Sequence, residues 1–445
     1  MSMERYKKYK PSGIEWIGEV PEHWELVKTK YVTRLNTGNS LNAEQKAYYS
    51  EVSEDTPNRP YIASKDIDRD TEFIDYDNGI RIPLNEQSFE VAPANSSLLC
   101  IEGGSAGKKM GFVDREVCFV NKLCCFNSFG INPKYQYYFI MSKPFWEVFS
   151  QNIQGMIGGV SVGVLKDIKL PNPPEVEQEA IAAYLDARCA DIDKVVATQE
   201  KRIALLKELK QSVITQAVTR GLNPDVKMKD SGVEWIGEVP EHWERISMKY
   251  FFYMKGRIGW QGLKADEFID EGPYLITGTD FENGRVVWER CYHISQERYN
   301  QDPAIHVKRG DLLITKDGTV GKLALIDDMP DIASLNSHLL ILRPYDANLI
   351  TNNYVYWYLS SQIFKIYTGL TQSGSIMESL SQEKIGDFQM ALPPIEEQKQ
   401  IASYLDGRCA DIDKQIEGVA RQIELLREYK QSLITEVVTG KRKVC

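Results

Sequence analysis

The chain has 445 residues, of which 42% are hydrophobic and 26% are charged, and its formal net charge is −10 at pH 7. This composition predicts a globular protein of roughly two to three domains and excludes a disordered or fibrous chain. The acidic balance argues against a simple nucleic-acid binder, because a protein that neutralises phosphates by itself usually carries a basic face.

Targeting and redox signals point to one compartment. No apolar run reaches the about 18 residues of a membrane helix, and the charged start MSMERYKKYK has no apolar signal core. The eight cysteines form no Cys-x-x-Cys pair, so they predict neither a zinc site nor another metal site. Free thiols of this kind are typical of a reducing cytoplasm, which is where we expect the protein to work.

Two blocks of sequence occur twice. A tryptophan-rich stretch, SGIEWIGEVPEHWE at Ser12–Glu25, returns as SGVEWIGEVPEHWE at Ser231–Glu244, with Ile14 replaced by Val233. A helix-forming block opens with two prolines, at Pro173 and again at Pro393. The order is stretch, variable region, helix, stretch, variable region, helix. It predicts a two-fold repeat in which the chain ends come together to complete one unit.

Each tryptophan-rich stretch contains helix breakers. Gly18 and Pro21 interrupt the first copy, so we predict a short irregular element that docks by its tryptophans. His23 and His242 are repeat mates, and no marked Ser, Cys or Asp partner accompanies them. Local hydrogen bonding explains these histidines better than catalysis.

The variable regions, residues 26–170 and 245–392, share the order of their landmarks. The first has predicted strands at Tyr61–Asp68 and Ser96–Gly104 and a helix at Lys134–Ile153 with a break at Pro144. The matching segments of the second region are Pro273–Phe281, Gly310–Asp327 and Asn352–Gly369. Many short strands with one or two helices predict two β-rich mixed domains of one fold.

The two helix-forming blocks, residues 175–219 and 395–439, carry a heptad seam that only a few polar residues interrupt, Lys210 and Lys430 among them. Each helix therefore needs a long partner, and the simplest partner is the other copy. At 1.5 Å per residue such a helix spans roughly 60 Å. Two-fold symmetry predicts an antiparallel coiled coil that separates the two variable domains, and the fold class is α+β.

One motif bears on catalysis. Asn172-Pro173-Pro174-Glu175 is similar to the Asn/Asp-Pro-Pro-aromatic signature of amino-methyltransferases, in which the aromatic ring stacks on a flipped base. Here Glu175 stands in place of the ring, the second copy reads Leu392-Pro393-Pro394-Ile395, and no glycine-rich cofactor loop follows a strand. A helix start explains both copies better, so we expect no catalytic residue in this chain.

Glycine-rich and polar loops of the variable regions are candidates for phosphate or base contacts. The repeated turns Gly103–Lys109 and Lys316–Lys322 can equally be ordinary hairpin turns with solvated lysines, and a solvated surface loop is the simpler explanation for any single residue of the polar loops. The candidate DNA-contacting residues are Ser105, Lys108, Lys109, Gln154, Lys255, Arg257, Lys316, Thr319, Lys322, Gln372 and Ser373.

A second group of side chains is expected to hold the repeats together or to dock a partner. Near-identical stretches and helices suggest that the same partner docks twice. These residues are Trp16, Trp24, Trp235, Trp243, Leu185, Ile192, Leu206, Leu405, Ile412 and Leu426.

Over nearly its whole length the chain resembles the specificity (S) subunit of type I restriction-modification enzymes. The resemblance is carried by the doubled tryptophan-rich stretch, by P-P-x-x-E-Q-x-x-I-A-x-Y-L-D at Pro173–Asp186 and Pro393–Asp406, and by paired L-x-G-T-x-G-like turns. The order and duplication of these parts are more specific than any one of them. Gly103-Gly104-Ser105 departs from the glycine-threonine turn that Gly318-Thr319 keeps, which weakens the DNA role of the first turn.

The resemblance implies a non-catalytic subunit with two target-recognition domains, each of which reads one half of a bipartite, asymmetric DNA site. The paired helices would set the separation of the half-sites. Two methyltransferase (M) subunits would supply S-adenosylmethionine and methylation at adenine N6, and restriction (R) subunits would add ATP- and magnesium-dependent translocation and cleavage. The implied division is 1–172, 173–222, 223–392 and 393–445, in which a stretch with its recognition domain alternates with a helix.

Two other functions remain as alternatives. One is a self-contained N6-adenine DNA methyltransferase, and the other is a scaffold whose variable domains bind proteins. Methyl transfer by the pure chain would favour the first, and a DNA preference unchanged by exchange of residues 26–170 would favour the second.

Overall fold

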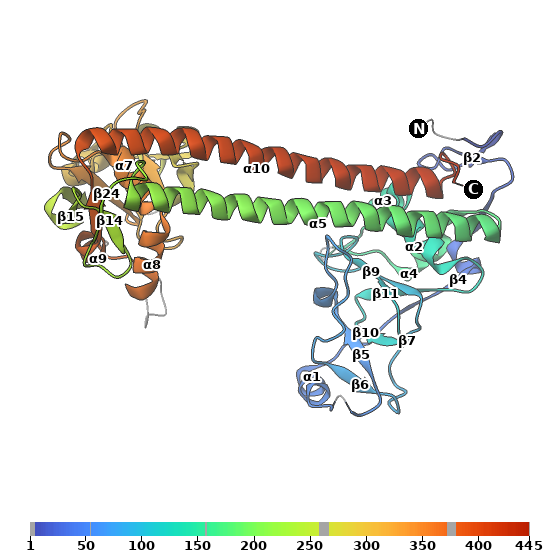
Figure 1. Ribbon diagram of the computed structural model, residues 1–445. Helices are drawn as coiled ribbons and strands as arrows, with labels where there is room; N and C mark the ends of the chain where they lie inside the picture. Colours follow the sequence, from blue (N-terminus) through green and yellow to red (C-terminus); the bar gives the residue numbers. More distant parts are fainter. Residues whose placement is uncertain (1–4, 54, 156–157, 258–266, 372–379, 445) are drawn as a thin grey trace. The chain divides into compact units, whose positions relative to one another are not determined.

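The computed structural model describes residues 5–53, 55–155, 158–257, 267–371 and 380–444 (Figure 1). The chain forms two compact units: unit 1 is Met1–Glu200 with Ala420–Cys445, and unit 2 is Lys201–Val419. Each unit combines one β-rich domain with part of both long helices, α5 (Glu175–Arg220) and α10 (Ile395–Val438). The predicted α+β class with two β-rich domains and a pair of long helices is therefore confirmed.

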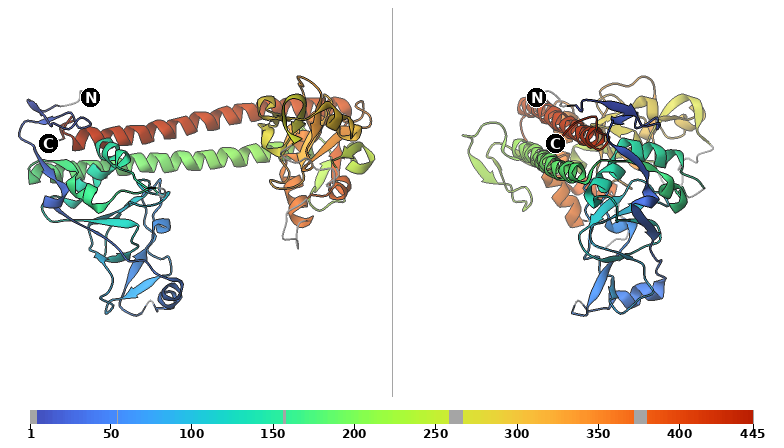
Figure 2. Two further views of the ribbon diagram at one scale, coloured as in Figure 1. Left: turned by 180° about the vertical axis from the view of Figure 1, so that it is seen from behind. Right: turned by 90° about the vertical axis from the view of Figure 1, so that its right-hand side faces the viewer.

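Unit 1 is built around two four-stranded sheets of order β4-β11-β8-β9 and β6-β5-β10-β7. In Figures 1 and 2, α2 and α3 lie next to the long helices, whereas α1, β5 and β6 lie far from them. The strands and short helices of this unit are β1 (Tyr9–Pro11), β2 (Glu19–Pro21), β3 (Glu25–Lys28), β4 (Thr33–Thr37), α1 (Ala43–Ser50), β5 (Asn58–Ile62), β6 (Arg81–Pro83), β7 (Val91–Ala92), β8 (Ser96–Cys100), β9 (Met110–Val113), β10 (Val117–Phe119), β11 (Leu123–Ser128), α2 (Pro133–Met141), α3 (Lys143–Gln151), α4 (Val162–Asp167) and β12 (Lys169–Asn172).

Unit 2 repeats this plan. Its sheet β16-β24-β21-β22 matches β4-β11-β8-β9, and its sheet β20-β17-β23 contains a parallel pair, as β5 and β10 do in unit 1. Its elements are β13 (Met228–Asp230), β14 (Glu238–Pro240), β15 (Glu244–Ser247), β16 (Phe252–Lys255), β17 (Ile269–Ile276), β18 (Phe281–Glu282), β19 (Arg285–Val286), β20 (Tyr292–His293), α6 (Gln296–Asn300), β21 (Leu312–Thr315), β22 (Leu323–Leu325), β23 (Ala333–Leu335), β24 (Leu339–Pro344), α7 (Asn352–Leu359), α8 (Gln362–Thr371), α9 (Gln382–Asp387) and β25 (Gln389–Leu392).

Most predicted elements are present, with shifted ends. The helix expected at Lys134–Ile153 is divided into α2 and α3 at Ser142, because Pro144 falls in the first turn of α3, where a proline is tolerated. The strand expected at Tyr61–Asp68 is displaced toward the N-terminus and ends at Ile62. A short 3₁₀ helix follows, in which the carboxylate of Asp66 accepts a hydrogen bond from the Ala63 backbone N–H at 2.8 Å.

The tryptophan-rich stretches were predicted to be irregular, which holds for residues 12–18 and 231–237 but not for the rest of each stretch. Each contributes one strand of a two-stranded antiparallel sheet, β1-β2 in unit 1 and β13-β14 in unit 2. The strands that pair with the stretches are Tyr9–Pro11 and Met228–Asp230. Both strands precede the stretches in the chain and have no alternating apolar pattern. The pairing therefore left no periodic signal in the sequence.

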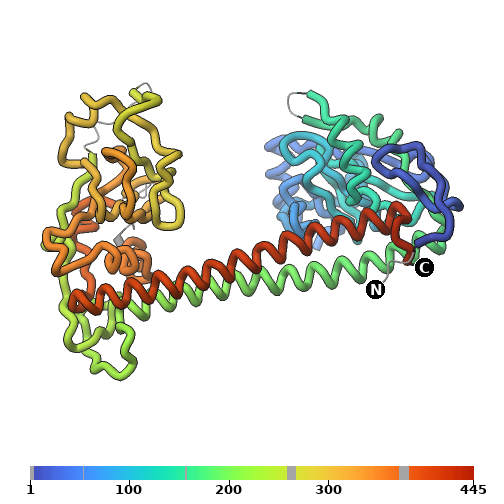
Figure 3. Tube along the Cα trace, turned by 90° about the horizontal axis from the view of Figure 1, so that it is seen from above, coloured from blue at the N-terminus to red at the C-terminus, as the bar shows by residue number. Residues whose placement is uncertain are grey.

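Within each unit the long helices run antiparallel and side by side (Figure 3). In unit 1 Lys430 pairs with Asp193 at 2.9 Å and Arg427 with Glu200 at 3.0 Å, and in unit 2 Lys210 pairs with Asp413 at 2.6 Å. The two lysines that interrupt the apolar seam thus make equivalent ion pairs in the two repeats.

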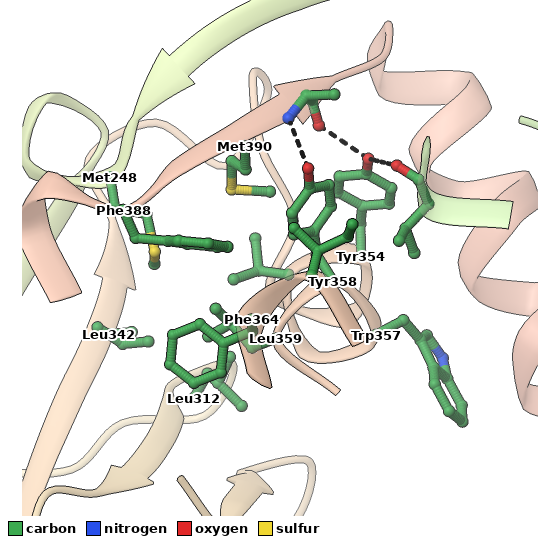
Figure 4. Close-up of a cluster of buried hydrophobic side chains, with 14 of the residues drawn as sticks. Met248, Leu312, Leu342, Tyr354, Trp357, Tyr358, Leu359, Phe364, Phe388 and Met390 are labelled. Atoms are coloured by element: carbon green, nitrogen blue, oxygen red, sulfur yellow. Dashed lines mark hydrogen bonds between the residues drawn. The ribbon is translucent and has the colours of Figure 1, made fainter. Parts of the chain in front are cut away.

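A tyrosine joins each domain to the end of the helix that comes from the other repeat. The Tyr135 hydroxyl lies 2.9 Å from the Pro171 carbonyl and 3.1 Å from the Val438 carbonyl. In unit 2 the Tyr354 hydroxyl lies 2.9 Å from the Ala391 carbonyl and 3.2 Å from the Val218 carbonyl (Figure 4). Both rings are fully buried, so the helix ends are part of each core.

The chain ends also meet within unit 1, as the repeat pattern predicts. The Tyr9 hydroxyl donates to the Gly440 carbonyl at 3.0 Å, and in Figure 3 the described N-terminal segment lies beside the end of α10. Gly440 has φ +73°, and a Cβ atom there would lie 2.3 Å from Pro21 Cδ. Glycine is required at this position both for its conformation and for the close approach of Pro21.

Candidate nucleic-acid interface

The repeated helix-start motif is explained almost residue by residue by contacts inside each unit. The Gln178 amide accepts from the Asn132 backbone N–H at 2.7 Å and donates to the Pro173 carbonyl at 2.8 Å. Its repeat mate Gln398 bonds the Thr351 N–H at 3.0 Å and the Pro393 carbonyl at 2.9 Å. The motif therefore attaches each domain to its helix.

The aspartates of the repeated motif also attach each domain to its helix. Asp186 accepts from the Tyr138 hydroxyl at 2.7 Å, and Asp406 accepts from the Trp357 indole at 2.9 Å. Two different aromatic donors thus fill one structural role.

The Asn-Pro-Pro segment is also structural. The Asn172 side-chain oxygen accepts from the Gln178 amide at 3.0 Å, and α5 begins at Glu175. This geometry agrees with a helix start, as the sequence favours.

Trp24 and Trp243 are fully buried, and their indoles donate to the motif glutamates. The distance is 3.0 Å from Trp24 Nε1 to Glu177 and 3.1 Å from Trp243 Nε1 to Glu397. His23 and His242 contact the same two carboxylates at 2.6 and 2.8 Å. These tryptophans hold the repeat together from inside, whereas Trp16 and Trp235 are only partly buried.

The predicted seam residues differ in burial. Leu185, Ile192, Leu405 and Ile412 are buried, and Leu206 and Leu426 are partly exposed. Leu405 belongs to the hydrophobic core of unit 2, where α10 packs against the domain.

The Glu177 cluster gives a pH-dependent prediction. Burial raises the pKa of Glu177, but hydrogen bonds from Trp24, His23 and Tyr6 outweigh burial, so the pKa lies below its ordinary value. A depressed carboxyl pKa stabilises the fold above the unfolded pKa near ~4.3, and this stabilisation is lost as pH falls through the folded pKa. Glu177→Gln should therefore cost about 1–2 kcal/mol at pH 7 and much less near pH 3, measured by urea unfolding at both pH values.

Glu179→Gln is the matched control, because Glu179 lies two residues away on the same helix and is exposed. It should change stability little at either pH. An equal effect of Glu177→Gln at both pH values would contradict the role of the charge.

The first glycine-rich turn joins β8 to β9. Ser105 is partly exposed and Lys108 is exposed, with its ammonium 3.1 Å from the Gly104 carbonyl. The Lys109 ammonium donates to the Ser64 carbonyl at 2.8 Å, so Lys109 braces the turn. The turn is thus a hairpin connection that presents Ser105 and Lys108 outward.

The second turn joins β21 to β22. The Thr315 hydroxyl donates to the Thr319 carbonyl at 2.5 Å and accepts from the Lys322 N–H at 2.9 Å. These two hydrogen bonds link the two ends of the turn. Thr319 and Lys322 are exposed, and Lys316 is partly buried. Both predicted turns are therefore hairpins that place polar side chains at the surface.

The loop that contains Gln154 docks on the first turn. The Gly103 N–H donates to the Gly158 carbonyl at 2.8 Å, and Gln154 and Gly159 exchange backbone hydrogen bonds at 2.9 and 3.0 Å. Gln154 and its neighbours line an open groove of about 670 Å³ together with residues of β4, the segment after β8 and the segment before β11. Its polar lining is Thr37, Glu102, Asn121, Gln154 and Ser161.

Sequence reasoning did not single out Asn121, because it stands alone before β11 with no motif around it. Thr37, the last residue of β4, is not among the candidate residues either. Their meeting with Gln154 depends on the tertiary fold.

Of the remaining candidate DNA-contacting residues of the second region, the structure describes Lys255 and Arg257. Lys255 is partly buried on β16. The Arg257 side chain is 2% exposed, and its guanidinium donates to the Leu335 carbonyl at 2.9 Å and to the Ser334 hydroxyl at 3.2 Å, so it faces the interior. Gln372 and Ser373 lie outside the described residues.

Two general properties complete the site. In the ranges that the structure describes, no three His, Cys, Asp or Glu side chains gather as they would around a metal ion. Over the same ranges no helix combines the length and apolar character that a membrane crossing needs.

The comparisons with known proteins agree with one another. The model of the type I restriction modification DNA specificity domain matches twice, at residues 21–207 and 240–424. The MjaVIII specificity subunit of Methanocaldococcus jannaschii is 25% identical over 440 residues, which cover 96% of this chain and 94% of that protein. The EcoKI specificity subunit of Escherichia coli K12 is 21% identical over 451 residues, covering 95% and 90%.

In three dimensions the fold is similar to that of a chain solved in work on complex assembly and conformational transition of the type I R-M system. The TM-score is 0.70 at 15% identity, with 94% of this chain and 98% of that chain covered. Two family matches of the DNA specificity domain fall on the two repeats seen here. The chain therefore belongs to the type I restriction-modification DNA specificity family, as a specificity subunit that recognises DNA and is not itself catalytic.

Proposed function

We propose that each β-rich domain reads one half of a bipartite, asymmetric DNA site and so directs adenine-N6 methylation and restriction by partner subunits. The observation that carries this proposal is the combination of a repeated scaffold with unlike loops. Contacts of Glu177, Gln178 and Tyr135 recur at Glu397, Gln398 and Tyr354. The exposed turns differ between the repeats, as expected of two readers with different base sequences.

The proposed DNA-contacting residues follow from exposure. Hydroxyl, amide and lysine side chains at turns suit phosphates and base edges. Partly or fully exposed candidates are Ser105, Lys108, Gln154, Lys255, Lys316, Thr319 and Lys322, to which the groove adds Thr37 and Asn121. Arg257 is left out because its guanidinium is buried, and Lys109 because its ammonium is engaged by a backbone carbonyl.

Partner subunits are proposed to dock on the long helices. Several apolar side chains of α5 and α10 are exposed, and exposed apolar surface favours protein contacts. These side chains are Val195, Leu205, Leu209, Tyr404, Leu425 and Tyr429. The proposed partners are two methyltransferase subunits, which would bring S-adenosylmethionine, and restriction subunits, which would bring ATP and magnesium.

The proposed division of the chain is that implied by the repeat, 1–172, 173–222, 223–392 and 393–445. It assigns each stretch to the recognition domain that follows it, in agreement with the pairing of β3 with β12 and of β15 with β25 at the edges of the domains.

Methylation mapping tests the proposed function directly. The chain is expressed with type I methyltransferase subunits from its own organism in a host without adenine methylation, and modified bases are located across the genome. We expect one bipartite, asymmetric sequence to carry N6-methyladenine on both strands. Methylation without a defined sequence, or by the chain without its partners, would contradict the proposal.

Salt dependence should separate the contributions of the subunits. The chain alone has a net charge of −10, so the partners must supply many of the phosphate contacts. We expect the logarithm of DNA affinity to fall more steeply with the logarithm of salt for the complex than for the specificity subunit alone. Fluorescence-anisotropy titrations between about 50 and 200 mM salt measure both slopes. Equal slopes would count against this division.

A further inference from the structure

The ion pair of Lys430 has an additional member that its repeat mate lacks. Lys430 lies 2.9 Å from Asp193 on α5 and 3.5 Å from Glu72 in the recognition domain of unit 1, and its side chain is 13% exposed. Lys210, in the same position of unit 2, pairs with Asp413 and is 28% exposed. Among the described residues of unit 2, no carboxylate of the recognition domain is recorded in an ion pair with Lys210.

The loop that carries Glu72 is held in one shape by its own contacts. The Asp68 carboxylate accepts from the Asp70 N–H at 3.0 Å, from the Thr71 N–H at 2.8 Å and from the Thr71 hydroxyl at 2.7 Å. The Asp68 N–H donates to the Phe73 carbonyl at 2.8 Å, and Ile74 is buried. These contacts therefore fix the conformation of the loop and with it the position of the Glu72 side chain.

Glu72 itself adopts φ +57°, in the left-handed region that non-glycine residues seldom occupy. Such a conformation persists only where the surroundings enforce it, and it is often associated with a functional constraint. Here it places a carboxylate, 25% exposed, against a partly buried lysine of the helix pair.

This contact comes from a different segment of the domain than the other attachments. The polar contacts described above join α2, α3 and the residues around them to the helices; one example is the Gln431 amide, which donates to the Met141 carbonyl at 2.6 Å. From residues 26–131, the contact of Glu72 with Lys430 is the one hydrogen bond or ion pair to α5 or α10 recorded in the described part of the chain. An attachment from a second segment of the domain restricts motion that the attachments of α2 and α3 alone would allow.

We propose that Glu72 is a positioning residue that fixes the orientation of the first recognition domain on the helix pair and thereby narrows the range of DNA spacers that the protein accepts. This inference rests on the proposed function, since a spacer exists only if two half-sites are read. No such tether joins Lys210 to the second domain within residues 223–257, 267–371 and 380–392, so the restriction acts on the first half-site.

The test uses the full chain in complex with its methyltransferase subunits. Glu72→Gln removes the charge with little change in shape. Glu72→Gly removes the side chain and suits φ +57°, so the loop keeps its shape. The control is Asp193→Asn, which weakens the pair between the helices and leaves Glu72 beside Lys430.

Two readouts are compared. The first is the methylation rate on DNA with the natural spacer divided by the rate with a spacer one base pair longer or shorter. We expect both Glu72 variants to lower this ratio at least about fivefold and the control to keep it within about twofold. The second is hydrogen exchange in segments 66–75 and 426–434 without DNA, which we expect to be faster in both Glu72 variants.

The outcomes are distinct. Unchanged exchange in both variants overturns the tether, and faster exchange with an unchanged spacer ratio overturns the positioning role. If the complex methylates no bipartite site, the proposed function fails and the positioning role falls with it, while exchange still shows whether Glu72 restrains the domain.

Discussion

Replacement of Trp24 by alanine should lower the melting temperature of unit 1 by about 6–20 °C, which corresponds to a loss of about 3–5 kcal/mol. Trp24 is fully buried, and its indole donates to Glu177 at 3.0 Å. It also lies against Gly440, so it joins the first stretch to the end of α10. Its loss leaves a cavity and removes one of the hydrogen bonds to the Glu177 carboxylate where the chain ends meet.

Trp16→Ala is the matched control, because Trp16 belongs to the same stretch and is only partly buried. Its effect should be less than half of that of Trp24→Ala, measured by circular dichroism on heating. Trp243→Ala should act on unit 2 as Trp24→Ala acts on unit 1, since Trp243 is equally buried. Similar losses for Trp16 and Trp24 would contradict the interpretation that the second tryptophan of each stretch holds the repeat together.

Replacement of residues 26–172 by a second copy of residues 245–392 should convert the methylated site into one with two identical half-sites. The chimera can fold because the helices bond mainly to features that both domains offer. Gln431 meets the Met141 carbonyl, and its repeat mate Gln211 meets the Ser360 carbonyl. Backbone carbonyls are independent of side-chain identity, so the transplanted domain keeps these contacts.

The expected loss on the original site is large. Each mismatched base pair costs about 1–3 kcal/mol, so a changed half-site of a few base pairs lowers affinity by at least about 100-fold. Genome-wide methylation mapping of the chimera measures the new site, and the reverse replacement, residues 26–172 in place of 245–392, should give the other symmetric site. An unchanged methylated sequence would refute the proposal that each domain reads one half-site.

Helix positions were predictable because their signals are local. The helix expected at residues 175–219 is α5 (Glu175–Arg220), and the one expected at 395–439 is α10 (Ile395–Val438). Proline at the start, glycine after the end and apolar residues three and four apart act within one or two turns. The duplication of these signals also revealed the repeat and the pairing of the helices.

Side-chain environments at the candidate site were not predictable in the same way. Arg257 has the residue type of a DNA contact, yet its guanidinium is buried against Ser334 and Leu335, far away in sequence. Asn121 has no motif, yet it lines the groove beside Gln154. Glu72 has no sequence signal, although it reaches Lys430 on the last helix.

The sequence by itself determined the repeat, the pair of long helices and the family. These features can be recognised because periodicity and duplication are local patterns of the sequence. Only the tertiary structure decided which polar side chains are exposed and which are buried in the core. It also decided which side chains attach a domain to the helices. The physical reason is that exposure depends on contacts between segments separated by tens to hundreds of residues, and no local pattern specifies such contacts.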